Sequence, residues 1–171
     1  METLRRIFYY LTNLEWTERK QHVCIFCDRK NFAKIVYEDE KLIVISNRRL
    51  AGQIHWLILP KEHAVRDIEN LDSSHLQLLQ SMDEVKRRLV QEHCPDIPPS
   101  WIHSGYHRGR RPLIGSIYYP DIVSIHHLHL HVIVKPKRML LWFKYPPWLR
   151  LMWKSDDRVL REVEMLSSKQ I

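Results

Sequence analysis

Short runs of alternating apolar and polar residues recur along the chain, with the period of two that is typical of half-buried β-strands. Charged residues 38–41 separate the first two runs and favour a hairpin between them, while prolines interrupt the chain before the fourth run. The runs predict about five strands, at residues 35–37, 42–46, 55–59, around 101–105 and 127–134.

Two other segments carry apolar residues at helical spacing, which predicts amphipathic helices. Asp72 or Ser73 is expected to cap the first, and its stripe, expected to face the sheet, comprises Leu76, Leu79, Met82, Val85 and Leu89. Ser155 or Asp156 is expected to cap the second, which uses Val159, Leu160, Val163 and Leu166. We therefore expect one α+β domain with an antiparallel sheet, a long helix across it and a C-terminal helix.

Composition fits a globular domain of this kind. The chain has 171 residues, of which 44% are hydrophobic and 27% charged, enough to bury a sizeable core. It contains no apolar run near the roughly 20 residues of a membrane span, and residues 1–16 lack the pattern of a signal peptide. Three cysteines argue against a disulfide scaffold. A cytoplasmic or nuclear location is therefore expected.

The net charge of +7 favours acidic partners, which include nucleotides, nucleic acids and anionic membrane surfaces. Residues 139–153 interleave aromatic and cationic side chains. Such a segment could stack on bases, lie at a membrane interface, or pack on the domain or across a dimer interface. Residues 106–121, which contain three arginines, are expected to form a long loop.

Histidines alternate with aliphatic residues where the last expected strand begins. His127, His129 and His131 would share one face, with neighbouring imidazoles roughly 6–7 Å apart, while Leu128 and Leu130 face the core with Val132. One phosphate group could contact two of these rings. The pattern therefore indicates a metal site or a phosphate-transfer site.

This run resembles the His-φ-His-φ-His-φ-φ motif of the histidine-triad (HIT) nucleotide-binding hydrolases. Two more segments agree in family order: residues 34–46 resemble the early hairpin, and residues 55–63, from His55 to His63, resemble the His-φ-φ-φ-φ-Pro-Lys-x-His segment. Cys24-x-x-Cys27 and the Gly-Tyr-His element at residues 105–107 are most similar to the type 3 Hint and aprataxin-like branches. The resemblance implies a HIT domain at residues 23–136, an N-terminal extension at 1–22 and an aromatic, basic C-terminal extension at 137–171.

The resemblance also implies the roles of individual residues. His129 would be the nucleophile that attacks an α-phosphorus, with its Nδ1 proton held by a backbone carbonyl of the triad strand. His131 would donate to a phosphate oxygen, and His127 and His55 would support the two reacting rings. Ser124, three residues before the first triad histidine, would contact the phosphate or the leaving group.

Several members of the family bind a structural zinc ion. Carried over residue by residue, the ligands here would be Cys24, Cys27, His63 and His127, a closed tetrahedral Cys₂His₂ set. For a Cys-x-x-Cys pair alone, redox activity, chance and burial remain as alternatives.

Asn47 and Arg48 depart from the family pattern, which often has an acidic residue and then a small apolar one for the nucleotide. Asn47 can still hydrogen-bond the ribose without charge assistance, and Arg48 could contact phosphate, stack on a base or face solvent.

The resemblance implies an adenosine 5′-monophosphoramidase-like hydrolase, acting on adenosine monophosphate joined to an amine through a nucleotidyl-histidine intermediate. An aprataxin-like removal of adenylate from nucleic-acid 5′ ends is the alternative enzyme, although no Cys/His pair follows the triad where aprataxin carries a zinc finger. A weakly active nucleotide-binding interaction module is the alternative of another class. A homodimer is expected from the family.

Overall fold

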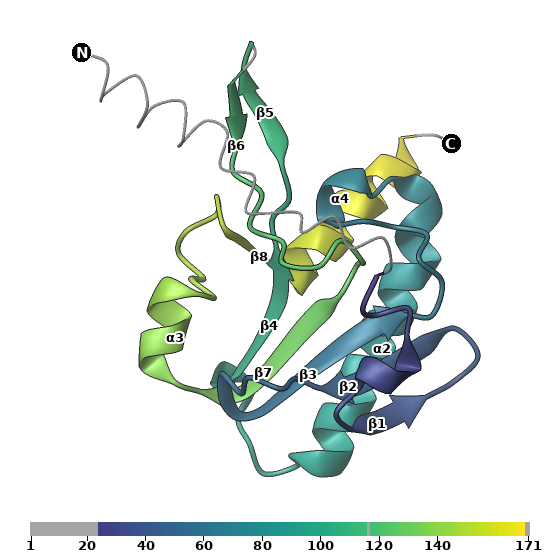
Figure 1. Cartoon of the computed structure of the whole chain (residues 1–171), viewed down its shortest axis with the longest axis vertical. Helices are drawn as coiled ribbons and strands as arrows, with labels where there is room; N and C mark the ends of the chain where they lie inside the picture. The colour runs from purple at the N-terminus through teal and green to yellow at the C-terminus, as the bar shows by residue number, and fades with distance from the viewer. Residues whose placement is uncertain (1–23, 116, 170–171) are drawn as a thin grey trace.

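The computed structural model describes residues 24–115 and 117–169, so the predicted N-terminal extension lies outside the described residues (Figure 1). One antiparallel sheet has the strand order β1-β2-β3-β7-β4-β8, and a separate hairpin pairs β5 with β6. The strands are β1 (Ile35–Glu38), β2 (Leu42–Ser46), β3 (Gly52–Pro60), β4 (Ile102–His107), β5 (Arg111–Ile114), β6 (Ile117–Tyr119), β7 (Leu130–Pro136) and β8 (Trp153–Ser155). The α+β prediction is confirmed, and the sheet has one strand more than the five expected.

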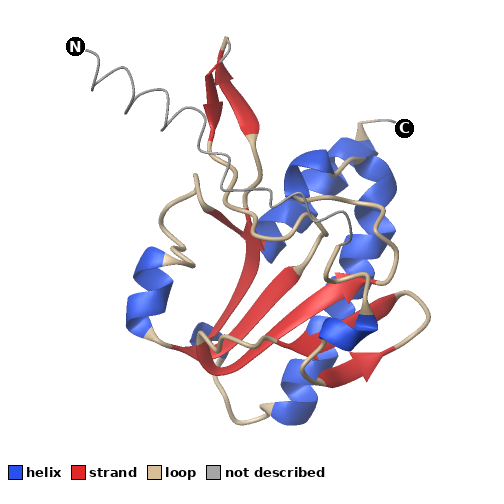
Figure 2. Cartoon of the chain, in the orientation of Figure 1, coloured by secondary structure: helices blue, strands red, loops and turns tan. Residues whose placement is uncertain are grey.

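The longer helices are α2 (Leu76–His93), α3 (Arg138–Phe143) and α4 (Asp156–Ser168). Short 3-10 turns occur at Arg29–Asn31, Ile68–Asn70, Ser73–His75 and Pro99–Trp101. Figure 2 shows α2 and α4 together on one side of the sheet, and α3 apart from both. No described helix is long and apolar enough to cross a membrane.

Helix α2 begins and packs as its sequence predicts. The Asp72 carboxylate accepts a hydrogen bond from the Ser74 amide at 2.9 Å, so Asp72 is the cap that leads into the helix through a 3-10 turn. Of the predicted stripe, Leu79, Met82, Val85 and Leu89 are buried, and Leu76 is partly buried. These side chains share the core with Leu128, Leu130 and Val132, which confirms the predicted inward face of the triad segment.

Strand β7 starts at Leu130 rather than at His127, because the chain bends at residues 124–127 before it joins the ladder. The Leu128 amide donates to the Val65 carbonyl at 2.9 Å instead of to a neighbouring strand. From Leu130 onward β7 lies between β3 and β4 and pairs with both. The first two triad histidines therefore lie just outside the strand, with His127 in the bend and His129 directly before β7.

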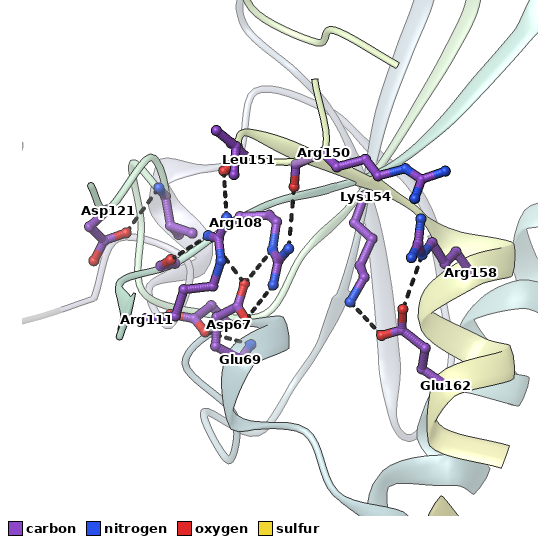
Figure 3. Close-up of polar contacts among 12 residues, drawn as sticks. Asp67, Glu69, Arg108, Arg111, Asp121, Arg150, Leu151, Lys154, Arg158 and Glu162 are labelled. Carbon is purple, nitrogen blue, oxygen red and sulfur yellow. Dashed lines mark hydrogen bonds and ion pairs between the residues drawn. The ribbon is translucent and has the colours of Figure 1, made fainter. Parts of the chain in front are cut away.

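The expectation of a long loop at residues 106–121 is wrong in part, because this region contains the β5–β6 hairpin. Gly115 takes the positive φ of +56° that the hairpin end requires. Figure 1 shows the hairpin projecting beyond the sheet. At its base Arg108 forms two hydrogen bonds with the Glu69 carboxylate, at 2.7 and 2.8 Å, and Arg111 donates to the Leu151 carbonyl at 3.0 Å (Figure 3). Arg110 lies over the Tyr118 ring at 4.4 Å, so all three arginines of this region make intramolecular contacts.

The chain after Pro136 adds β8 to the free edge of β4. Gly105 permits this pairing, since a Cβ there would lie 2.4 Å from the Lys154 carbonyl oxygen and 2.8 Å from the Trp153 ring. Tyr145 and Trp153 from this region are buried with Ile133 and Ala51. Part of the aromatic segment therefore packs on the domain, one of the three roles considered for it.

A buried ion-pair network joins α2, β4 and α4. The Lys86 ammonium lies 2.5 Å from the Asp156 carboxylate and 2.7 Å from that of Asp83, and Ser104 donates to Asp156 at 2.9 Å. Burial lowers the pKa of Lys86, but these two carboxylates raise it overall. Asp156, expected as a possible cap, instead uses its carboxylate to hold α4 on the sheet.

We expect Lys86→Met to lower the free energy of unfolding by about 3–5 kcal/mol, because it leaves the buried Asp156 carboxylate without its cation. Denaturant unfolding measures the change. Arg87→Met is the matched control, because the Arg87 side chain is exposed in its pair with Asp83 and its loss should change stability by less than about 0.5 kcal/mol. Equal effects of the two substitutions would contradict the role of Lys86 as the cation that compensates Asp156. The Lys86→Met/Asp156→Asn double variant should be more stable than Lys86→Met alone, and the opposite result would also contradict that role.

Candidate active site

A hydrogen bond to the backbone occupies one ring nitrogen of His129 and leaves the other ring nitrogen free of that contact. Its Nδ1 lies 2.7 Å from the His127 carbonyl oxygen, so Nδ1–H donates to the backbone and Nε2 carries the lone pair. Phe26 packs edge-on against the ring, with 5.3 Å between centroids. The side chain is buried, at 6% exposure. This is the orientation that nucleophilic attack through Nε2 requires.

His131 lies next to His129 and is linked to His55 of β3. The rings of His129 and His131 are 4.8 Å apart, and His131 Nδ1 lies 3.0 Å from His55 Nε2. His55 Nδ1 is 3.3 Å from the Ala51 amide nitrogen. His55 Nδ1 also lies 3.2 Å from the Arg49 carbonyl oxygen, which can only accept, so the His55 proton is on Nδ1. His55 Nε2 then accepts from Asn47 Nδ2–H at 3.3 Å and from His131 Nδ1–H at 3.0 Å. In this arrangement Nε2 carries the lone pair on both His129 and His131.

Three aromatic side chains that the sequence analysis gave no role pack around His131. His107, Tyr145 and Trp153 have ring centroids 5.0, 5.3 and 5.7 Å from that of His131, and all three are buried. Within the described part of the chain, His131 Nε2, His107 Nδ1 and Trp153 Nε1 are buried without a hydrogen-bond partner. His107 belongs to the Gly-Tyr-His element noted in the sequence, whereas Tyr145 and Trp153 come from the C-terminal extension and carry no motif.

Burial keeps these imidazoles neutral. It lowers the pKa of His129 to about 4, that of His55 to about 4 and that of His107 to about 3. Burial also lowers the pKa of His131 well below its usual range, and the neighbouring His129 and His107 act in the same direction. At neutral pH a neutral His129 needs no deprotonation before it reacts.

His127 turns away from the other two triad rings toward the N-terminal cysteines. Its Nε2–H donates to the Pro60 carbonyl at 2.8 Å, which leaves Nδ1 as the nitrogen available to a metal. That nitrogen lies 3.6 Å from both the Cys24 and Cys27 sulfurs, and His63 Nδ1 lies 3.3 Å from the Cys27 sulfur. One donor atom from each residue lies within 4.8 Å of every other.

These distances fit a tetrahedral zinc site. Bonds of about 2.3 Å to sulfur and 2.0–2.1 Å to nitrogen at tetrahedral angles place neighbouring sulfur and nitrogen ligands roughly 3.6 Å apart. The four predicted ligands are the set that the fold brings together, and the Pro60 carbonyl fixes the tautomer that coordination needs.

Ser124, Asn47 and Arg48 are the remaining residues that the sequence predicts for the site. Ser124 is exposed in the bend before His127, and its hydroxyl forms no hydrogen bond with the described residues. The Asn47 amide is engaged within the chain, with Nδ2 3.3 Å from His55 Nε2 and Oδ1 accepting from the Arg49 amide at 3.0 Å. Arg48 donates to the Asn31 carbonyl at 2.8 Å.

Comparison with known proteins identifies relatives over most of the chain. Residues 20–144 match the family described as scavenger mRNA decapping enzyme C-term binding. The chain is 30% identical over 137 residues to bifunctional adenosine 5′-phosphosulfate phosphorylase/adenylylsulfatase HINT4 of Arabidopsis thaliana, covering 77% of this chain and 79% of that protein. It is 31% identical over 121 residues to adenosine 5′-monophosphoramidase HINT3 of Xenopus tropicalis, covering 68% of this chain and 70% of the relative.

An aprataxin of Danio rerio is 34% identical over 98 residues, which cover 57% of this chain but 26% of that protein. Among solved structures, a HIT family hydrolase of Clostridium thermocellum superposes with a TM-score of 0.52 at 24% identity, over 65% of this chain and 89% of that one. The family match, the two relatives with similarity along most of their length, and the triad geometry agree: this chain belongs to the histidine-triad family.

Proposed function

We propose that this chain is a nucleotide hydrolase that cleaves the bond between adenosine monophosphate and an amine through a nucleotidyl-His129 intermediate. The observation that carries the proposal is the 2.7 Å hydrogen bond from His129 Nδ1 to the His127 carbonyl, which leaves Nε2 as the nucleophile. The similarity to an adenosine 5′-monophosphoramidase and to an adenylylsulfatase supports adenylate as the transferred group.

The proposed reaction has two steps. His129 Nε2 attacks the α-phosphorus, the phosphorus–nitrogen bond breaks, and the amine leaves with a proton taken from solvent, which the attacking water of the second step returns. Water then attacks the same phosphorus, which releases adenosine monophosphate and restores the imidazole. His131 is the proposed donor to a phosphate oxygen, for which its Nε2 first takes up a proton, and His55 holds the His131 ring. Ser124 is the proposed contact to the phosphate or the departing amine.

The nucleotide-binding roles predicted for Asn47 and Arg48 are retained as proposals, with a restriction. Both side chains already make hydrogen bonds within the chain, to His55 and to the Asn31 carbonyl respectively. Asn47 can therefore offer the ribose one N–H and one oxygen lone pair while it orients His55, and Arg48 would have to exchange its carbonyl partner for the nucleotide.

We expect His129→Ala to lower turnover of a fluorogenic adenosine phosphoramidate by at least about a thousandfold, because the substitution removes the nucleophile. Steady-state kinetics measure the loss. His93→Ala, which removes an exposed histidine at the end of α2, is the control and should keep wild-type turnover. Turnover by His129→Ala at the wild-type rate would contradict the proposed intermediate.

The aprataxin-like alternative is tested in the same assay with adenylated DNA as a second substrate. The similarity to aprataxin and the net charge of +7 favour it. Two arginines of the 106–121 region are engaged with Glu69 or the Leu151 carbonyl, which weakens the case for that region as a DNA-binding surface. A clear kinetic preference for adenylated DNA over the phosphoramidate would replace the leading proposal with this one.

The neutral histidines around His131 predict how stability depends on pH. His55 and His107 have pKa values of about 4 and about 3 in the folded chain, below the value near 6.5 of an unfolded histidine. Below pH 6.5 the unfolded chain therefore binds more protons than the folded chain. The contribution of these two neutral histidines to the free energy of unfolding is complete above pH 6.5 and is lost as the pH falls toward 4.

We expect each of these two histidines to contribute about 1 kcal/mol per pH unit to that slope, and His107→Phe to remove one contribution. Denaturant unfolding between pH 7 and about pH 4.5 measures the slope. His93→Gln, on the exposed end of α2, should leave it unchanged. An identical slope in wild type and His107→Phe would show that His107 does not titrate below its usual range.

We further propose that Cys24, Cys27, His63 and His127 bind a structural zinc ion. The fit of their donor atoms to tetrahedral geometry supports this assignment. Bound zinc would tie the N-terminal Cys-x-x-Cys turn to the end of β3 and fix the His127 ring. The backbone carbonyl of His127 in turn orients His129.

Metal analysis of the purified chain is expected to find one zinc ion per molecule, and Cys27→Ser to abolish stoichiometric binding. Loss of zinc should lower stability, by about 4 kcal/mol where free zinc had been a thousandfold above its dissociation constant. Cys94→Ala is the control, because Cys94 lies in the hydrophobic core and is not one of the four proposed zinc ligands. Stoichiometric zinc in Cys27→Ser, or none in the wild-type chain, would overturn the assignment.

Homodimerisation and a cytoplasmic or nuclear location remain predictions from the resemblance and the composition. Strand β8 pairs with residues 105–107 of β4, so a dimer that extends the sheet at this edge would have to use the rest of β4 or displace β8.

A further inference from the structure

Helix α3 is apolar on both of its faces. Leu140 and Leu141 pack inward against the buried cluster that contains Tyr145 and Trp153. Met139, Trp142 and Phe143 point outward and are 74%, 64% and 77% exposed. A helix that is apolar all round is normally buried in a protein or in contact with lipid. The outward face of α3 is therefore exposed to solvent, although its apolar side chains favour burial in protein or contact with lipid.

A fourth exposed aromatic side chain extends this face. The Trp148 ring lies 6.0 Å from that of Trp142 and is 59% exposed. Met139, Trp142, Phe143 and Trp148 together form what we call the α3 patch. The segment between them is anchored at Tyr145, whose side chain is buried among the rings of His55, His107 and His131. The patch is thus displayed by an anchored segment, and in Figure 1 α3 stands out from the sheet on the side away from α2.

Cations surround the patch, and acidic residues are nearly absent from this part of the sequence. Between Asp96 and Asp156 the chain has nine lysines and arginines but a single acidic residue, Asp121. Four of the nine flank α3 closely and are exposed: Lys135, Lys137, Arg138 and Lys144. Exposed aromatic side chains bordered by lysine and arginine are the composition of helices that lie in the interface of an anionic bilayer.

We propose that the α3 patch binds the surface of a membrane containing anionic lipids, with Met139, Trp142 and Phe143 inserted at the level of the headgroups. The cations at the two ends of α3 contact the lipid phosphates and carboxylates. This is peripheral binding by a short surface helix, and it is independent of the hydrolysis proposed above.

The charges favour a membrane over a second copy of this chain. A two-fold symmetric contact through the patch would bring its cationic border against the same border of the partner, and the sequence between Asp121 and Asp156 offers no acidic residue to compensate. The shape of the patch favours a bilayer over nucleic acid. Met139 and Phe143 protrude from a helix, which suits insertion among lipids, whereas bases stack on aromatic platforms that line a basic groove.

The location of α3 connects this surface to the candidate active site. A single residue, Lys144, separates the exposed Phe143 from Tyr145, whose ring is 5.3 Å from that of His131. A bilayer bound at the patch would therefore lie beside the wall of the histidine cluster.

The test is co-sedimentation of the full chain with vesicles of phosphatidylcholine alone or of phosphatidylcholine with phosphatidylserine. We expect binding to the anionic vesicles that weakens with added salt, and roughly tenfold or more weaker binding to the neutral ones. Trp142→Ser combined with Phe143→Ser should reduce partitioning to anionic vesicles by at least roughly tenfold, because it removes the two aromatic side chains that would insert into the bilayer. Both residues are exposed, so thermal unfolding should be unchanged.

Two matched variants separate the patch from general effects. Met165→Ser with Leu166→Ser removes two exposed apolar side chains from α4 and should leave vesicle binding intact. Lys137→Glu with Arg138→Glu should weaken binding roughly tenfold or more, whereas charge reversal at the exposed Lys30 and Arg161 should change it far less.

Three results would overturn the proposal. These are absence of sedimentation with anionic vesicles, equal binding to neutral vesicles, and full binding by the Trp142/Phe143 double variant. Binding of a single-stranded oligonucleotide that the double variant loses, without vesicle binding by the wild type, would assign the patch to nucleic acid instead.

Discussion

The register between β3 and β7 is the constraint on which the rest of the site depends. In this antiparallel pair Leu57 lies opposite His131 and His55 opposite Ile133, so both histidines emerge on the face away from α2. A slip of one residue would turn Leu130 and Val132 toward the site and bury the histidines against Met82 and its neighbours. Core packing and assembly of the candidate active site therefore select the same register. The apolar side chains that fill the core alternate along the strands with the histidines of the site.

Two backbone carbonyls then divide the triad into two functions. The Pro60 carbonyl, at the end of β3, holds the Nε2 proton of His127 and directs Nδ1 toward the cysteines. The His127 carbonyl holds the Nδ1 proton of His129 and leaves Nε2 free. The same residue thus faces the candidate metal through its ring and orients His129, the proposed nucleophile, through its main chain. Whatever fixes His127 in place also fixes the tautomer of His129, which couples the N-terminal turn to the reaction.

The sequence predicted the parts of this arrangement that depend on local periodicity. Alternation identified β2, β3 and the inward side of β7, and the 3.6-residue stripe identified α2, because one face of each element must be buried. It did not identify β8, a three-residue strand whose pairing depends on close approach to Gly105. The β5–β6 hairpin was missed because Arg and Pro interrupt its apolar pattern. Strand β7 begins late because a hydrogen bond to Val65, remote in sequence, holds Leu128.

The motif named the reacting residues but not the side chains that surround them. Tyr145 and Trp153 lie 14 and 22 residues beyond His131, in a segment whose composition was compatible with several roles. Long-range packing alone places them against His107 and His131, where their bulk excludes water and lowers the pKa of the imidazoles. The chemistry of the triad therefore depends on a part of the chain outside the motif. That same part displays the exposed face of α3, so one segment both packs against the histidine cluster through Tyr145 and carries the α3 patch.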